Sequence, residues 1–311
     1  MFLPLLLDAI FAATFILGGK ATSFVPPLFY VGLRMIISGT LLLAYLACFT
    51  KEKLTIAKKH VGWFLGIIVF HIYFAFVLEY ICYDYLPASY VALVYNISPF
   101  ITALFAYLCL SERITKKQWL GILIGVGAML PFALLQGAPT TARIQVGLLG
   151  SILAQFTAIM SVVATCGGWV FFKKVTVDLK YSCLFANGVG MIFGGILSYI
   201  SSLCIETQPT LSTVLNPYFL ILLGLSILIG NVIVYNMYGL LLKRYSTTLM
   251  SLSSCTIPLF AALYDWAWLG TPIGPLFIVT ALITSVGIYI FYKDELRTKK
   301  SSSCDYLEEG R

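Results

Sequence analysis

Five side chains that carry or can carry a charge lie inside long apolar stretches of this 311-residue chain. They are Asp8, Arg34, His71, Glu79 and Asp265. A charge at membrane depth costs about 2.5–3.5 kcal/mol on insertion scales, so each of these residues is a functional candidate. Asp8 could bind a cation or a proton in a cavity, or it could be a structural partner of Arg34 or of a helix dipole.

The other four residues offer different chemistry. Arg34 carries a planar guanidinium that suits a carboxylate, although its early place in an apolar segment equally fits a role in holding helices together. Glu79 could attract a cationic substrate or be solvated near the membrane interface. His71 could relay protons, but a lone histidine more often satisfies one hydrogen bond. Asp265 is followed by Trp266 and Trp268, and this favours an interfacial position.

Uncharged polar residues add groups for hydrogen bonding and stacking. Tyr95 and Asn96 are neighbours, while Asn231 and Tyr235 are four residues apart and therefore share one helix face. Gln155 is a further polar residue in an apolar segment. These residues could line a substrate cavity. They could instead form hydrogen bonds between helices, which contribute about 0.6 kcal/mol each in a membrane.

Helices that cross a membrane are needed to position these residues. The chain is 60% hydrophobic and 11% charged, whereas a soluble domain carries about 25% charge. Ten apolar segments, most of them near the ~20 residues that span a bilayer, predict an all-α integral membrane protein with ten transmembrane helices. The expected segments are 2–19, 26–49, 61–83, 86–110, 119–135, 146–171, 181–204, 217–240, 246–269 and 273–292.

The basic residues predict the orientation in the membrane. All 20 lysines and arginines except Lys20, Arg34 and Arg143 fall in alternate gaps between segments or in the C-terminal tail. Because basic loops stay in the cytoplasm, we expect a multi-pass protein of the bacterial inner (cytoplasmic) membrane with both termini cytoplasmic. The net charge of +7 is split among short loops, so it gives no reason to expect a nucleic-acid partner. The expected partners are the lipid bilayer and a small-molecule substrate.

An internal repeat relates two parts of the chain. The residues around Pro99 resemble those around Pro258, 159 positions later. Basic residues follow the first copy closely but not the second, so the copies are expected to face opposite ways. Paired prolines within helices suit kinks or hinges beside a site, and a static kink is the simpler of the two. We therefore predict two inverted five-helix repeats around a central cavity, at 1–138 and 139–293, followed by a disordered cytoplasmic tail at 294–311.

The third to fifth segments carry the motifs of a known family. The motif residues are Gly66, Tyr85 to Ser89, Pro99, Leu110 to Thr115, Gly121 and Gly127. This order of a proline, a Ser-Glu-Arg turn and a glycine-rich helix resembles the half-repeat of the EamA family of drug/metabolite transporters, and Arg34 matches that family's early arginine. The resemblance is weaker in the second half, where Thr271 replaces Glu112. The first segment also departs from it, with Asp8 and no tryptophan.

The resemblance implies ten helices in two inverted halves, a central cavity and transport of a small solute. Members of the family move amino acids, nucleotide-related metabolites and other small molecules. Within the family, transporters of intracellular bacteria that exchange S-adenosylmethionine for S-adenosylhomocysteine are a candidate subfamily, and an amino-acid or drug exporter is the alternative.

We therefore expect a secondary transporter that works by alternating access and is not an enzyme. An intramembrane enzyme would need a paired nucleophile and base or a set of metal ligands, and neither the two histidines nor the eight scattered cysteines suggest one. A scaffold or receptor would have no need of a site at the membrane midplane. We expect no cofactor and no metal, and either a monomer or a homodimer.

Overall fold

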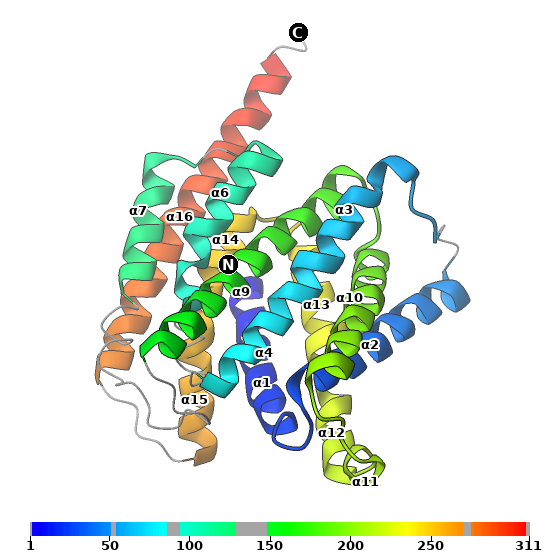
Figure 1. Ribbon diagram of the computed structural model, residues 1–311. Helices are drawn as coiled ribbons and strands as arrows, with labels where there is room; N and C mark the ends of the chain where they lie inside the picture. Colours follow the sequence, from blue (N-terminus) through cyan, green and yellow to red (C-terminus); the bar gives the residue numbers. More distant parts are fainter. Residues whose placement is uncertain are drawn as a thin grey trace.

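The structure, a computed structural model, describes the backbone of residues 2–50, 54–85, 94–112, 114–128, 148–269 and 275–308. Every regular element in these ranges is a helix (Figure 1). Six helical stretches among the described residues are long and apolar enough to cross a bilayer, and two further apolar helices are shorter. The fold is therefore all-helical, as the sequence predicts.

The chain runs through the following elements. The first are α1 (Phe2–Ala21), α2 (Pro27–Phe49), the 3-10 turn η1 (Lys58–His60), α3 (Val61–Gly66), the π-helix η2 (Ile67–Phe74), α4 (Ala75–Tyr85), the 3-10 turn η3 (Tyr95–Ile97), α6 (Ser98–Leu110) and α7 (Lys116–Gly127). The next are α9 (Leu148–Lys173), the π-helix η4 (Lys174–Asp178), α10 (Cys183–Ile205), α11 (Leu211–Val214), α12 (Pro217–Leu225), the π-helix η5 (Ser226–Val234) and α13 (Tyr235–Leu241). The last are α14 (Thr247–Ser253), the 3-10 turn η6 (Ser254–Thr256), α15 (Ile257–Leu269) and α16 (Pro275–Glu308).

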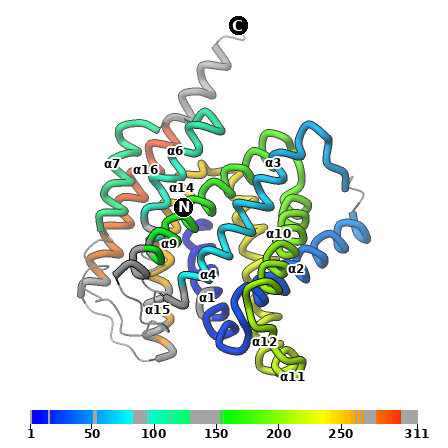
Figure 2. The backbone as a smooth tube through the Cα atoms, in the orientation of Figure 1, coloured from blue at the N-terminus to red at the C-terminus, as the bar shows by residue number. Residues whose placement is uncertain are grey.

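Two helix pairs flank a central group of helices. At one side α7 lies against α16, and at the other α2 lies against α10 (Figure 2). Between the two pairs, α9 contacts η2, α4 and α6, while α1 contacts η5 and α15. Finally, α6 contacts α14. The middle of the bundle is thus built from segments far apart in the sequence.

Glycines set the close approach of both outer pairs. A Cβ atom on Gly287 of α16 would lie 2.6 Å from the backbone nitrogen of Gly125 and 2.7 Å from the carbonyl oxygen of Gly121. A Cβ atom on Gly39 of α2 would lie 2.7 Å from the carbonyl oxygen of Gly188. Only glycine allows backbones to meet this closely, which is how helices pack tightly in lipid.

The helical breaks recur at a fixed distance along the chain. Two π-helices begin at Ile67 and Ser226, two 3-10 turns at Tyr95 and Ser254, two α-helices at Ser98 and Ile257, and two more at Lys116 and Pro275. Each second member starts 159 residues after the first. This is the spacing that the sequence around the two prolines predicts.

The two prolines occupy matched positions in these breaks. Pro99 and Pro258 were expected inside continuous helices, but each is the second residue of an α-helix that follows a 3-10 turn. A proline has no backbone N–H to donate, so it fits the first turn of a helix, where that donor has no intrahelical partner. Whether either break acts as a hinge stays a prediction.

The last helix differs from the expectation of a disordered tail. α16 continues past residue 293 to Glu308. Its residues just beyond 293 are held by hydrogen bonds, because Thr115 Oγ1 donates to Asp294 at 2.5 Å and Ser246 donates to Glu295 from its backbone nitrogen at 3.0 Å and from Oγ at 2.7 Å. These contacts tie the start of the expected tail to the bundle.

Candidate functional site

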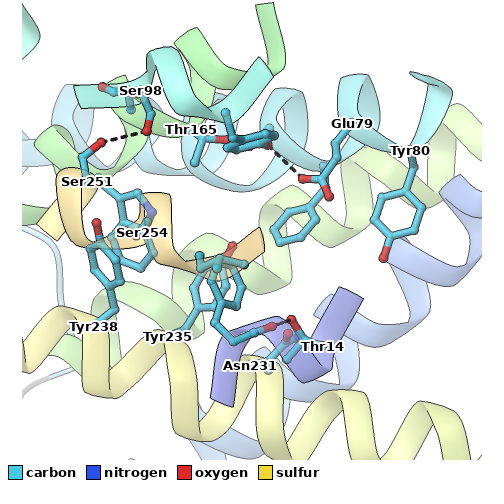
Figure 3. A pocket seen from close by; sticks show the side chains of 18 of the residues that line it. Thr14, Glu79, Tyr80, Ser98, Thr165, Asn231, Tyr235, Tyr238, Ser251 and Ser254 are labelled. Atoms are coloured by element: carbon cyan, nitrogen blue, oxygen red, sulfur yellow. Dashed lines mark hydrogen bonds between the residues drawn. The ribbon is translucent and has the colours of Figure 1, made fainter. Parts of the chain in front are cut away.

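A cavity opens among the central helices. It encloses about 1180 Å³ of space, its open mouth included. Its lining comes from α1, α2, α4, α6, α9, η5, α13, α14 and α15 and the turns beside them (Figure 3). Segments from both ends of the chain therefore meet around one space.

The cavity brings together most of the predicted site residues whose side chains are described. Arg34, Glu79, Tyr95, Asn231 and Tyr235 line it, and so does Pro258. Three of the predicted side chains, those of Asn96, Gln155 and Asp265, lie outside the described part of the structure. Asp8, His71 and Pro99 are not among the lining residues.

Glu79 is held by a hydroxyl cluster on one wall. Tyr95 Oη donates to Glu79 Oε2 at 2.9 Å (Figure 3). The same phenol oxygen lies 3.0 Å from Ser161 Oγ and 3.3 Å from Thr165 Oγ1 of α9. Ser161 in turn donates to the carbonyl oxygen of Ala75 at 3.0 Å. The carboxylate therefore has a fixed direction at the cavity wall and is joined to helices on both sides of it.

Arg34 provides the positive charge of the cavity. Its side chain is only 4% exposed, and its guanidinium carbon lies 5.4 Å from the ring centre of Tyr30 and 5.1 Å from that of Phe76. Among the described residues no carboxylate forms an ion pair with it, and its Nε has no hydrogen-bond partner. In the structure Asp8 is not the partner of Arg34. The guanidinium is held between aromatic rings and still offers donors.

Asp8 contacts a break in the helix instead. Its carboxylate is 1% exposed, and its oxygens lie 3.3 Å from Ser254 Oγ and 3.3 Å from Thr256 Oγ1, both in η6. The same hydroxyls lie 3.1 Å from the carbonyl oxygen of Met250 and 2.8 Å from that of Ser253. Each hydroxyl has one proton and can donate to one of its two acceptors. Asp8 is therefore coupled to the 3-10 turn, and through Ser254 to the cavity.

Aromatic rings form another part of the lining. Trp169 of α9 stacks on Tyr238 with ring centres 3.9 Å apart and an interplanar angle of 23°, and it lies 5.2 Å from Tyr235. Phe76 stacks on Tyr235 at 6.1 Å and 28°. Behind them, His71 meets Trp169 edge-on at 4.1 Å. The arrangement gives the cavity a continuous aromatic surface.

Sequence reasoning missed Trp169 and Tyr238. Tyr238 could have been found, because it follows Tyr235 by three residues and so lies on the same helix face. Trp169 follows two glycines, and a Cβ atom on Gly168 would collide with the backbone of His71. This glycine lets α9 approach η2 and so places Trp169 at the cavity, which periodicity alone does not reveal.

Asn231 both lines the cavity and forms a hydrogen bond between helices, the two roles that the sequence leaves open. It lines the cavity from η5, and its Nδ2 donates to Ser38 Oγ of α2 at 2.7 Å. Its Oδ1 is buried and has no partner among the described residues. Asn236 donates from Nδ2 to the carbonyl oxygen of Val232 at 2.8 Å, which satisfies one backbone group of this π-helix. π-helical turns are frequent at functional sites.

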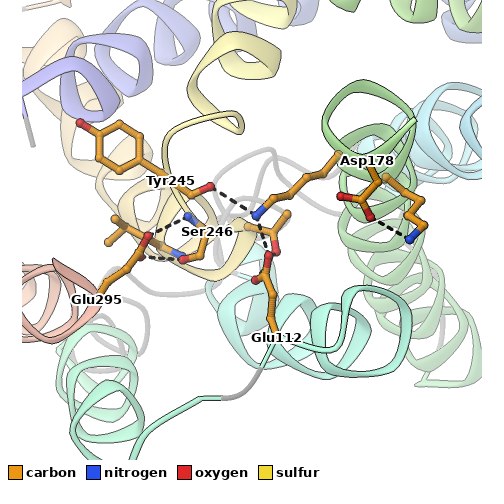
Figure 4. A network of polar contacts seen from close by, with 9 residues as sticks. Glu112, Asp178, Tyr245, Ser246 and Glu295 are labelled. Carbon is orange, nitrogen blue, oxygen red and sulfur yellow. Dashed lines mark hydrogen bonds and ion pairs between the residues drawn. The ribbon is translucent and has the colours of Figure 1, made fainter. Parts of the chain in front are cut away.

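A second polar cluster lies at one end of the bundle, away from the cavity. We call this the basic end, and it carries Lys116, Lys117, Lys173, Lys174, Lys243, Arg244, Lys293 and Arg297. Lys173 Nζ donates to Glu112 Oε1 at 2.5 Å and to the carbonyl oxygen of Tyr245 at 3.4 Å, and Thr247 Oγ1 donates to Glu112 Oε2 at 3.3 Å (Figure 4). The cluster joins the ends of α6 and α9 to the turn before α14.

Comparison with known proteins places this architecture in a family. The sequence matches the EamA-like transporter family over residues 1–134 and 152–293. It is 30% identical over 303 residues to the S-adenosylmethionine/S-adenosylhomocysteine transporter of Chlamydia trachomatis serovar L2, covering 96% of this chain and 90% of the relative. The protein with the same description from Chlamydia muridarum is 29% identical over 305 residues, with 96% and 92% covered.

Two further matches are more distant. Protein PecM of Dickeya dadantii is 27% identical over 255 residues, covering 78% of this chain and 81% of the relative. A solved crystal structure superposes with a TM-score of 0.69 at 18% sequence identity, covering 93% of both chains. At that identity the likeness concerns the fold.

Proposed function

The chain belongs to the EamA-like transporter family of multi-pass membrane proteins, which are transporters and not enzymes. We propose that it is a secondary transporter that moves a small metabolite by alternating access. The cavity carries this proposal. It is lined from both halves of the chain and presents one arginine, one glutamate and a set of aromatic rings. A space of this chemistry between two related halves is what a transport site at the membrane midplane requires.

The proposed architecture is ten transmembrane helices in two inverted five-helix halves, 1–138 and 139–293. The element starts that recur 159 residues apart support it. The contacts between elements are also repeated when each element is replaced by its equivalent in the other half. The contacts of α1 with η5 and with α15 are equivalent to those of α9 with η2 and with α6. The pairs α2–α10 and α7–α16 each join two equivalent helices. Two-fold related halves of this kind can rock around a fixed site. We place the basic end and both termini in the cytoplasm and the protein in the inner membrane, as a monomer or a homodimer.

The proposed cargo is S-adenosylmethionine, taken up in exchange for S-adenosylhomocysteine. The relatives with that description, at 30% and 29% identity over nearly the full chain, favour it. The cavity chemistry agrees, since the cargo combines a carboxylate, positive charges and a flat ring. The proposed binding residues are Asp8, Arg34, Glu79, Tyr95, Asn96, Gln155, Asn231 and Tyr235. An amino-acid or drug exporter of the same family is the alternative.

Counterflow into liposomes tests the proposal. The purified protein is reconstituted into liposomes loaded with unlabelled S-adenosylhomocysteine, and uptake of labelled S-adenosylmethionine is followed against protein-free liposomes. We expect uptake that depends on the internal solute. Uptake of labelled amino acids instead would favour the alternative, and no flux of any solute in counterflow or under a proton gradient would refute the transporter.

A further inference from the structure

The charges that line the cavity balance each other. Among the described lining residues, Arg34 is the only lysine or arginine and Glu79 the only aspartate or glutamate. A single arginine has no second cation beside it to neutralise a multiply charged phosphate chain. One positive and one negative side chain suit a cargo that carries one carboxylate and one cationic group.

Arg34 is a buried cation without a carboxylate partner among the described residues. Its side chain is only 4% exposed, in a helix long and apolar enough to cross a membrane, and its guanidinium remains charged under all ordinary conditions. A buried charge is costly unless it is paired and hydrogen-bonded. Rings of Tyr30 and Phe76 give it partial compensation through cation–π contact. Its Nε is buried without a hydrogen-bond partner in the described part of the structure, while the residue as a whole lines the cavity.

The aromatic surface of the cavity starts next to the guanidinium of Arg34. Phe76 lies under the guanidinium at 5.1 Å and stacks on Tyr235 at 6.1 Å, and Tyr235 lies 5.2 Å from Trp169. A molecule held by its carboxylate at Arg34 would therefore extend along this surface. Stacked rings of this kind take a flat heterocycle by stacking or an onium group by cation–π attraction.

We propose that Arg34 binds the carboxylate of a zwitterionic, amino-acid-like cargo whose flat or onium group lies on Trp169, Tyr235 and Tyr238. This inference rests on the proposed transport function and adds what the site requires of its cargo. The carboxylate is the obligatory handle, and Glu79 accepts the ammonium group. S-adenosylmethionine and aromatic amino acids belong to this class, whereas adenosine and nucleotides do not.

Paired ligands with and without the carboxylate test the inference. Binding to detergent-solubilised protein is measured for S-adenosylmethionine against its decarboxylated amine, and for phenylalanine and tryptophan against phenethylamine and tryptamine. For each zwitterion that binds, the wild type should bind the carboxylate-bearing compound (the acid) about 10- to 100-fold more tightly than the matching amine. This is the contribution of a charge-assisted hydrogen bond expressed as a ratio of affinities. In Arg34→Gln that preference should fall to about 3-fold or less.

Two variants guard against a purely structural effect. Arg34→Lys keeps the charge and should retain part of the preference, while Lys243→Gln removes an exposed charge at the basic end and should change nothing. The inference is overturned if Arg34→Gln weakens acid and amine equally, or if no zwitterion of the panel binds to the wild type. If the preference is found but liposomes show no flux, the transport function fails and the carboxylate site stands. If Arg34→Gln does not fold, Arg34→Lys is the test variant. A preference for the carboxylate-bearing ligand that is smaller than in the wild type supports the inference, and an unchanged preference overturns it.

Discussion

The ion pair at the basic end holds the two halves of the chain together. Glu112 comes from the turn after α6, whereas Lys173 ends α9 and Thr247 begins α14. Cys166 lines the cavity and precedes Lys173 by seven residues, about 10 Å along a helix. The pair therefore joins α6 to α9 at the basic end, about 10 Å along α9 from a residue that lines the cavity. We predict that Glu112→Gln shifts the protein toward a state that is open at this end.

The magnitude follows from the burial of the pair. The side chain of Lys173 is 13% exposed and that of Glu112 is 25% exposed, so the pair lies between a surface pair and a buried one. Surface pairs contribute about 0–1 kcal/mol, and breaking a buried pair costs about 3–5 kcal/mol. Hydrogen bonds to a charged group contribute about 1.5–3 kcal/mol, which we take as the loss. An equilibrium between two states would move by about 10- to 100-fold.

Labelling of Cys166 measures this shift. A variant that keeps Cys166 as its single cysteine is reconstituted in vesicles of both orientations and treated with a membrane-impermeant maleimide. Glu112→Gln should raise the labelling rate from the basic end by about tenfold or more. The control is Asp178→Asn, which breaks the pair with Lys174 inside one helical turn, where the side chains are 28% and 43% exposed. Equal labelling rates of Cys166 in Glu112→Gln and in its parent, or an equal rise of that rate in Asp178→Asn, would show that the Lys173–Glu112 pair does not keep the protein closed at the basic end.

Two further substitutions test the packing and the break beside the cavity. Gly287→Ala places a Cβ atom against the backbone of Gly125 and should cost about 1–3 kcal/mol, seen as a lower thermal unfolding temperature, whereas the Cβ atom in Gly62→Ala meets nothing within 4 Å and should not lower that temperature. An unchanged temperature for Gly287→Ala would contradict the close approach. Asp8→Asn should lower the initial rate of transport without lowering expression, because the amide cannot take up a proton beside Thr256. A wild-type rate would make Asp8 structural.

The sequence predicts the helices well because lipid leaves a chain few choices. Backbone polar groups must be satisfied within each segment, so a long apolar run becomes a helix. The described helices accordingly begin within three residues of the expected segments, except for the segment expected at 86–110, whose start lies outside the described residues. The cost of a charge in lipid likewise singled out Arg34 and Glu79, and both line the cavity.

Contacts between distant segments could not be predicted in this way. Asp8 was chosen by the same argument but meets η6, because the partner of a buried acid depends on which helices become neighbours. Trp169 is one of many aromatic residues in apolar segments, and only the approach of α9 to η2 gives it a place at the cavity. The α16 extension is stabilised by Asp294 and Glu295, whose partners Thr115 and Ser246 directly precede α7 and α14. Local composition contains none of this information.

The two halves share their backbone breaks but differ in their chemistry. Phe76 and Tyr235 are 159 residues apart and stack on each other, and at the same spacing Glu79 corresponds to Tyr238. Among the described lining residues, the first half thus supplies both charges, Arg34 and Glu79, and the second supplies Trp169, Tyr235 and Tyr238. Under the proposed alternating access, matched breaks would let both halves move alike, whereas unlike linings would bind the cargo in one orientation. Substitutions at the breaks should therefore change transport rates for every cargo, and substitutions in the lining should change which cargo is accepted.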